Sequence, residues 1–142
     1  MANTVQQEWK EEVMQATSNT SLAGTVSTIF TTDAYSASDV FVNPGLSAVF
    51  GDGANTFAGR ENLATKTFGV LAANTFDAAD TVFASLNSSS TSVTAISIFT
   101  DTTTDTTSRL VAYFDTGTGL AFSTSTGAQV TIQWSGSGIF TL

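Results

Sequence analysis

The chain of 142 residues contains no cysteine and no histidine. Without these residue types a Ser-His-Asp triad or a Cys-His dyad cannot form, and the usual ligands of a zinc site are missing. Disulfide bonds are excluded as well, so cysteine usage does not indicate a redox compartment. These two absences remove the most common catalytic centres from consideration.

Basic residues are scarce: four Lys and Arg stand against twelve Asp and Glu, for a formal net charge of −8. An acidic surface repels phosphate backbones and anionic lipids, so we expect neither nucleic acid nor a membrane as partner. No apolar run approaches the length of a membrane span. Residues 1–12 lack the apolar centre of a signal peptide. If the protein acts outside a cell, release by lysis inside an assembled particle would bring it there.

What the chain does contain is typical of a β protein. It has 42% hydrophobic residues and 11 Phe, with many Ser and Thr. Threonine suits a pleated strand, and serine favours turns. Apolar stretches separated by turn-forming residues predict strands near residues 25–32, 63–68, 76–83, 92–100, 108–114, 129–134 and 139–142. The fold expected is mainly β: a single antiparallel β-sandwich or barrel over residues 21–142.

The N-terminal segment has a different period. Thr4 can cap a helix, and Val5, Trp9 and Val13 follow at intervals of four residues, which makes one apolar stripe. A helix this short needs a surface to pack on. We expect residues 1–20 to form a helical arm whose stripe is an interface with a neighbouring subunit. The alternative is that the stripe covers the sheet of its own domain.

Acidic pairs are the remaining candidates for chemistry, because two carboxylates suffice for glycoside hydrolysis. The pairs are Asp77 with Asp80 and Asp101 with Asp105. Both lie in segments that read as turns, where Asp bonds to nearby backbone. Neither pair matches a calcium loop, and Gly51-Asp52-Gly53 lacks the context of a dinucleotide site. We therefore expect no enzyme activity, no metal and no cofactor.

Four further residues have simple structural interpretations. Arg60, next to Glu61, and Arg109 at the start of a strand are expected on the surface or in a salt bridge, with an interface as the alternative. Trp134 is expected in the core, since Val130, Ile132 and Trp134 alternate with polar residues.

Several segments resemble a family of small structural proteins of tailed bacteriophages, which act in head decoration, as cement or at the head–tail junction. Its stretch "FDADDVTF" is similar to residues 76–83, and "LIAYIDTGTGLP" is similar to residues 110–121. Its "ITITW" and "GIFRL" are similar to residues 130–134 and 138–142, and residues 28–35 also fit the family. The chain departs from the pattern with Ala121 in place of proline and Thr141 in place of a basic residue.

The resemblance implies a non-enzymatic virion protein with no catalytic residues to carry over. We expect a decoration or cement protein that is assembled in the host cytoplasm and binds the outer surface of the phage head. Its partner would be the major capsid protein, with several copies forming a homo-oligomer on the particle. The alternatives are a neck or tail component, or a β-sandwich carbohydrate-binding module with exposed aromatic side chains.

Overall fold

The computed structural model describes residues 3–5, 9, 21–32, 59–86, 92–104 and 107–142. The ten elements that lie within these residues are all strands, and every pairing between them is antiparallel. The prediction of a mainly β, antiparallel protein is therefore confirmed. Within the described part of the chain, no helix is long and apolar enough to cross a membrane.

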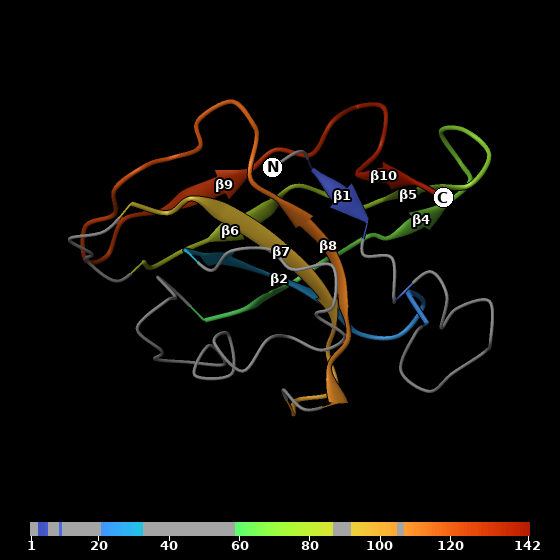
Figure 1. Ribbon diagram of the computed structural model, residues 1–142, viewed down its shortest axis with the longest axis horizontal. Coiled ribbons are helices and arrows are strands. Elements are labelled where there is room, and N and C mark those ends of the chain that lie inside the picture. Colours follow the sequence, from blue (N-terminus) through green and yellow to red (C-terminus); the bar gives the residue numbers. More distant parts are fainter. Residues whose placement is uncertain (1–2, 6–8, 10–20, 33–58, 87–91, 105–106) are drawn as a thin grey trace.

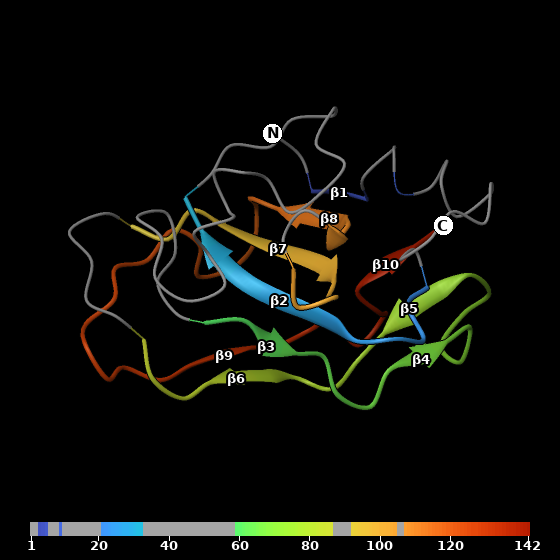
Figure 2. The same ribbon diagram turned by 90° about the horizontal axis from the view of Figure 1, so that it is seen from below.

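The largest sheet has five strands in the order β1-β8-β7-β2-β3 (Figures 1 and 2). Their bounds are Thr4–Val5 for β1, Leu110–Phe114 for β8, Ala95–Thr100 for β7, Val26–Thr31 for β2 and Glu61–Asn62 for β3. The centre of the sheet is the β2–β7 pair, whose six residue pairs are in register from Val26 with Thr100 to Thr31 with Ala95. All six residues of β2 are buried. This strand therefore has no face exposed to solvent.

Two smaller sheets complete the described fold. One has the order β10-β5-β4, and the other is the pair β6-β9. Their bounds are Thr67–Phe68 for β4, Thr75–Asp77 for β5, Thr81–Phe83 for β6, Val130–Ile132 for β9 and Phe140–Thr141 for β10. The strands β5 and β6 follow each other along the chain, and so do their partners β9 and β10. Each of the two sheets therefore contains one strand of the consecutive pair β5 and β6 and one strand of the consecutive pair β9 and β10.

The smaller sheets pack against the five-stranded sheet through two apolar clusters. In the first, Val26 of β2 and Ile98 of β7 meet Phe76 of β5 and Phe140 of β10. In the second, Phe30 of β2 meets residues of β6 and β9, namely Phe83 and Ile132. The Phe30 and Phe83 rings lie 4.4 Å apart between centroids. Since β2 contributes buried residues to both clusters, it joins the two halves of the core, together with β7, whose Ile98 belongs to the first cluster and whose Ile96 packs against the second.

The structure corrects two predictions at the level of elements. Thr4 and Val5 form β1, paired with Tyr113 and Ala112 of β8, so the helix does not begin at Thr4. The rest of the proposed helix, apart from Trp9, lies outside the described residues. Of the strand predicted over residues 63–68, only Thr67 and Phe68 form a strand, β4, and the preceding strand β3 ends at Asn62 in another sheet. Between them the backbone of Thr65 has a positive φ of 51°, which a continuous strand does not allow.

Candidate functional site

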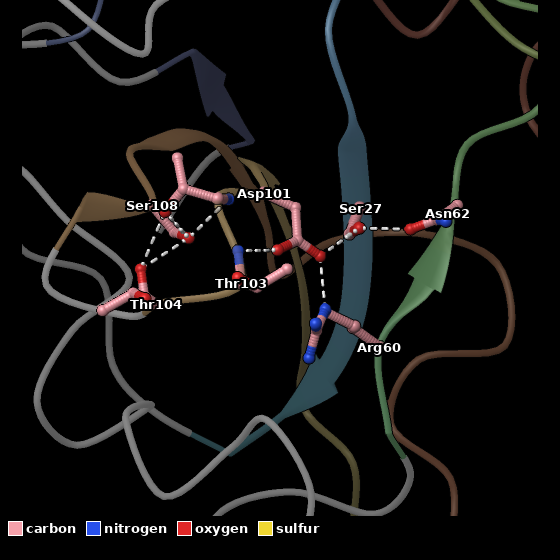
Figure 3. Close-up of polar contacts among 8 residues, drawn as sticks. Ser27, Arg60, Asn62, Asp101, Thr103, Thr104 and Ser108 are labelled. Atoms are coloured by element: carbon pink, nitrogen blue, oxygen red, sulfur yellow. Dashed lines mark hydrogen bonds and ion pairs between the residues drawn. The ribbon is translucent and has the colours of Figure 1, made fainter.

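Asp101 lies at the centre of a polar cluster at the end of β7 (Figure 3). Its side chain is only 2% exposed. One carboxylate oxygen accepts the Thr103 amide at 2.8 Å, and the other accepts the Ser27 hydroxyl at 2.8 Å. The second oxygen also forms an ion pair with the Arg60 guanidinium. Asp101 thus bonds to its own turn, to β2 and to the residue that precedes β3.

The cluster links β2, the residues next to β3 and the turn that follows β7. Ser27 is fully buried, and its oxygen lies 2.8 Å both from Asp101 and from the Asn62 amide oxygen. A hydroxyl has one proton, so it donates to one of these acceptors at a time. The Ser27 hydroxyl therefore links β2 either to Asp101 or to Asn62 of β3. A hollow of about 640 Å³ lies beside the cluster and is lined by Arg60, Glu61, Asn62, Asp101 and neighbouring residues.

Hydroxyl groups close the turn that follows Asp101. The Ser108 hydroxyl donates to the Thr104 carbonyl at 2.8 Å, and the Ser108 oxygen accepts the Thr102 amide at 3.0 Å. The bond from Thr103 to Asp101 is the local backbone bond expected of a turn aspartate, so the turn interpretation of Asp101 is confirmed. Asp105 lies outside the described residues.

The two residues of the other acidic pair, Asp77 and Asp80, have different surroundings. Asp80 accepts the Trp134 amide at 3.0 Å. Asp77 is half-buried, and its Oδ1 atom has no hydrogen-bond partner. Among the described residues, no group of three or more acidic side chains is placed so that it could hold a metal ion.

A cleft of about 740 Å³ opens between the five-stranded sheet and β9. Aromatic side chains line it, among them Phe114, Phe122 and Trp134, all half-buried. The rim is polar and its lining carries no charged side chain; it includes Asn3 and Gln133. Such a lining suits an uncharged ligand with apolar surface.

Trp134 is therefore less buried than the alternation of its strand predicts. It packs against both apolar clusters, and its ring lies 6.3 Å from that of Phe114. Its indole N–H donates to the Thr81 hydroxyl at 3.2 Å. Sequence reasoning missed the cleft because it depends on how far apart β8 and β9 lie, and strand patterns do not contain that distance.

Of the interface residues predicted from the sequence, the structure describes Val5 and Trp9. Trp9 is 1% exposed and belongs to the core cluster of its own chain, with its ring 6.2 Å from Phe140 in an edge-to-face arrangement. Val5 is half-buried in β1, and Val13 lies outside the described residues. For Trp9 the structure thus favours the alternative that its side chain covers its own domain.

The two arginines have different surroundings. Arg60 forms an ion pair with Asp101, as the salt-bridge interpretation predicts. Arg109 is only 9% exposed, which corrects the surface interpretation, and its amide donates to the Thr100 hydroxyl. Lys66 donates to the Gly24 carbonyl, and partial burial lowers the pKa of its amine.

Comparisons with known proteins give no further assignment. No family model matches the chain, and no match was found among curated proteins or solved structures.

Proposed function

We propose that this chain is a non-enzymatic structural protein of a tailed bacteriophage that decorates the outer surface of the head. It would bind the major capsid protein in many copies, as a homo-oligomer on the particle. In the same proposal its antiparallel sheets form a single β-sandwich, and residues 1–20 provide contacts with a neighbouring subunit.

One observation carries this proposal: the segments that resemble the phage family are paired with one another in the fold. Phe76 of the "FDADDVTF"-like segment lies opposite Phe140 of the "GIFRL"-like segment. The same segment places Thr81 opposite Ile132 in the "ITITW"-like strand. The resemblance therefore involves residues that contact each other across strands, and not only scattered turns.

A specific bond strengthens this argument. Asp80 of the first segment accepts the backbone amide of Trp134, 54 residues further along the chain. Two motifs that are distant in sequence are thus joined by a bond between a side chain of one motif and the backbone of the other. This is expected when a resemblance reflects a shared fold and not shared composition.

The proposal is tested on particles of the phage that encodes the chain. Heads and tails are separated after dissociation, and the chain is quantified in each fraction by mass spectrometry. A decoration protein is expected in the head fraction, in numbers comparable to the shell subunits. A few copies in the tail fraction would support the neck or tail alternative, and absence from particles would contradict both.

The aromatic cleft supports a second candidate, a carbohydrate-binding module. Sugar rings pack on aromatic faces, and the uncharged rim offers amides and hydroxyls to sugar hydroxyls. Neutral oligosaccharides should then shift the fluorescence of Trp134, and the shift should vanish in Trp134→Phe while Trp9 still emits. No shift across a panel of neutral glycans would count against this candidate.

A further inference from the structure

Strand β9 has a hydrogen-bonded partner on one side only. It pairs with β6, and the two strands form a sheet of their own, seen side by side in Figure 2. Within the described part of the chain, no strand pairs with the other side of β9, which we call the open edge. The aromatic cleft lies along this strand, because Thr131 and Gln133 are among the residues that line it.

The bonds on either side of β9 show which backbone groups face the open edge. The Ala128 carbonyl accepts the Leu86 amide at 2.9 Å, and the Trp134 amide donates to Asp80, the residue before β6, at 3.0 Å. Along an antiparallel strand, the N–H and C=O groups of successive residues point to opposite sides. Since residues 128 and 134 bond toward β6, the N–H and C=O of Thr131 point to the open edge.

The sequence of β9 does not protect this edge against a further strand. Proteins commonly protect a free edge with charged side chains, proline or a bulge, because unpaired N–H and C=O groups attract other strands. Residues 129–134, with the sequence QVTIQW, contain no charged residue and no proline. The side chains of Gln129, Thr131 and Gln133 are exposed. An accessible edge of this kind is suited to accept an extended peptide.

The cleft beside the open edge has aromatic walls in fixed positions. Phe114 and Trp134 are both half-buried, with their rings 6.3 Å apart. The indole N–H of Trp134 donates to the Thr81 hydroxyl at 3.2 Å, so this ring is oriented before a ligand arrives. In a strand added to β9, every second side chain would point to the side on which these rings lie. Apolar side chains at alternate positions therefore fit the cleft.

Charge specifies the occupant further. The lining of the cleft carries no charged side chain, so a charged group inserted there would lose water without gaining a partner. Around the cleft the charge is negative: Asp115 lies between Phe114 and Thr116, two residues of the lining, and the chain has a net charge of −8. This field favours basic residues on either side of the inserted part. The complementary occupant is an extended segment with an uncharged, alternately apolar centre and basic flanks.

We propose that the open edge of β9 and its cleft bind such a segment of the major capsid protein, which adds to the β6–β9 pair as a third strand. The inference rests on the proposed function and identifies the contact that attaches the chain to the head. Main-chain bonds to Thr131 would align the segment, and its apolar side chains would contact Phe114 and Trp134. Many copies on one lattice would add these modest contacts.

Two other occupants fit the observations less well. A neutral glycan can pack on the aromatic walls, but it cannot form a regular ladder with the backbone groups of the open edge. A second copy of this chain would bring its own β9, which lies within an uncharged stretch over residues 116–142 and therefore has no basic flanks. Two copies would also bring together bodies that each carry a net charge of −8.

The test uses overlapping peptides of about 12 residues, longer than an ordinary strand, that cover the major capsid protein encoded by the same phage. Binding of each labelled peptide to the purified chain is measured by fluorescence anisotropy. We expect one segment with an uncharged centre to bind. Its affinity should fall as the salt concentration rises, because its basic flanks meet an acidic body.

Two substitutions at one position separate main-chain from side-chain recognition. Thr131→Pro removes the N–H that faces the open edge but no bond to β6, and it should weaken binding of that peptide at least about tenfold. Thr131→Val is the matched control: it keeps the N–H and nearly the same shape, and should bind like the wild type. Added to heads from a phage that lacks the gene for this chain, the two variants should co-sediment in the same order.

Since proline also fixes φ at its own position, a second measurement leaves the protein unchanged. In a bound strand, only every second N–H of the peptide points to β9. Methylating the peptide nitrogens one at a time should therefore weaken binding at alternate positions and leave it unchanged at the positions between them. Loss at every position, or at none, would contradict strand addition.

The outcomes separate the two proposals. Wild-type protein that does not bind the heads would overturn the proposed function and this inference together. Protein that binds the heads while no peptide binds it would overturn only the inference, and so would equal binding by folded Thr131→Pro and Thr131→Val. Displacement of the peptide by neutral glycans at low concentration would assign the cleft to carbohydrate. A dimer in sedimentation velocity that Thr131→Pro abolishes would assign the open edge to a second copy, and either result would overturn the inference.

Discussion

Asp101 connects parts of the chain that are 74 and 41 residues away, through Ser27 and Arg60. Replacing it with Asn keeps one oxygen for the Thr103 amide. The new NH₂ group, however, would face the Ser27 hydroxyl and the Arg60 guanidinium, and Arg60 would lose its counter-charge. We expect Asp101→Asn to lower the free energy of unfolding by about 2–4 kcal/mol, measured by urea denaturation.

Asp80→Asn is the control for this prediction. Asp80 is exposed, and its Oδ1 atom accepts the Trp134 amide, a role that an Asn oxygen can also perform. The change should therefore cost less than about 1 kcal/mol. Equal losses in the two variants would show that Asp101 is no more than another surface turn residue. Head binding should persist in both variants, because neither carboxylate belongs to the proposed contact surface.

Gly138 is a second residue whose identity the packing requires. Its φ is +99°, and a Cβ atom there would lie 2.2 Å from the Thr75 side chain and 3.3 Å from the Phe76 carbonyl oxygen. Gly138→Ala should therefore cost about 2–3 kcal/mol. Gly136→Ala, in the same loop with open space around it, should change stability by less than about 0.5 kcal/mol. Similar melting temperatures for the two variants would contradict the close approach of β10 to β5.

At the scale of elements, burial and pairing differ among the strands. The strands β2 and β7 have hydrogen-bonded neighbours on both sides and are almost fully buried, whereas β3 is a two-residue strand at a sheet edge. Hydrogen exchange should be slowest in β2 and β7, at the rate set by global unfolding, and faster in β3 by local opening. Slow exchange that is uniform across β3 and β2 would contradict this order.

The strands that sequence reasoning placed correctly are those with a regular pattern. Val130 and Ile132 alternate with exposed Thr131, and the structure keeps this alternation in β9. In β8 an alternating pattern would leave one face exposed, but both faces are covered. Val111 and Tyr113 on one face are buried, and so are Leu110 and Ala112 on the other. Sequence patterns show which face is apolar, but they do not show that a second face is also covered.

The candidate sites were predictable only where they are local. The bond between Asp101 and Thr103 follows from the preference of Asp for turns. The bonds to Ser27 and Arg60 depend on which strands become neighbours, and no local signal specifies that order. The same reason explains why no continuous strand forms over Leu63–Phe68. The chain passes to another sheet near Thr65, and this depends on a positive φ at a threonine, which its residue type does not predict.

At the scale of the whole molecule, Trp9 decides how the N-terminal segment relates to the β body. Its side chain is 1% exposed among Phe140, Ile98 and Val26 of the first cluster. Trp9→Ala should lower the free energy of unfolding of the isolated chain by about 3–5 kcal/mol. Trp9→Phe retains most of the apolar volume and should cost less. An unchanged melting temperature for Trp9→Ala would favour the prediction that residues 1–20 are an arm that docks on a neighbouring subunit. It would count against the alternative that Trp9 packs on its own domain.

The two tryptophans also test whether the described sheets unfold as one unit. Trp9 belongs to the first cluster, whereas Trp134 packs against both clusters from β9 and its adjoining loop. Since β2 joins the clusters, we expect one cooperative transition. The variant Trp134→Phe leaves Trp9 as the reporter, and Trp9→Phe leaves Trp134. Each fluorescence transition in urea should then coincide with the loss of far-ultraviolet circular dichroism of the same variant. If the Trp9 signal changed at lower urea than the β signal, residues 1–20 would detach before the body unfolds, and the arm would be a separate unit.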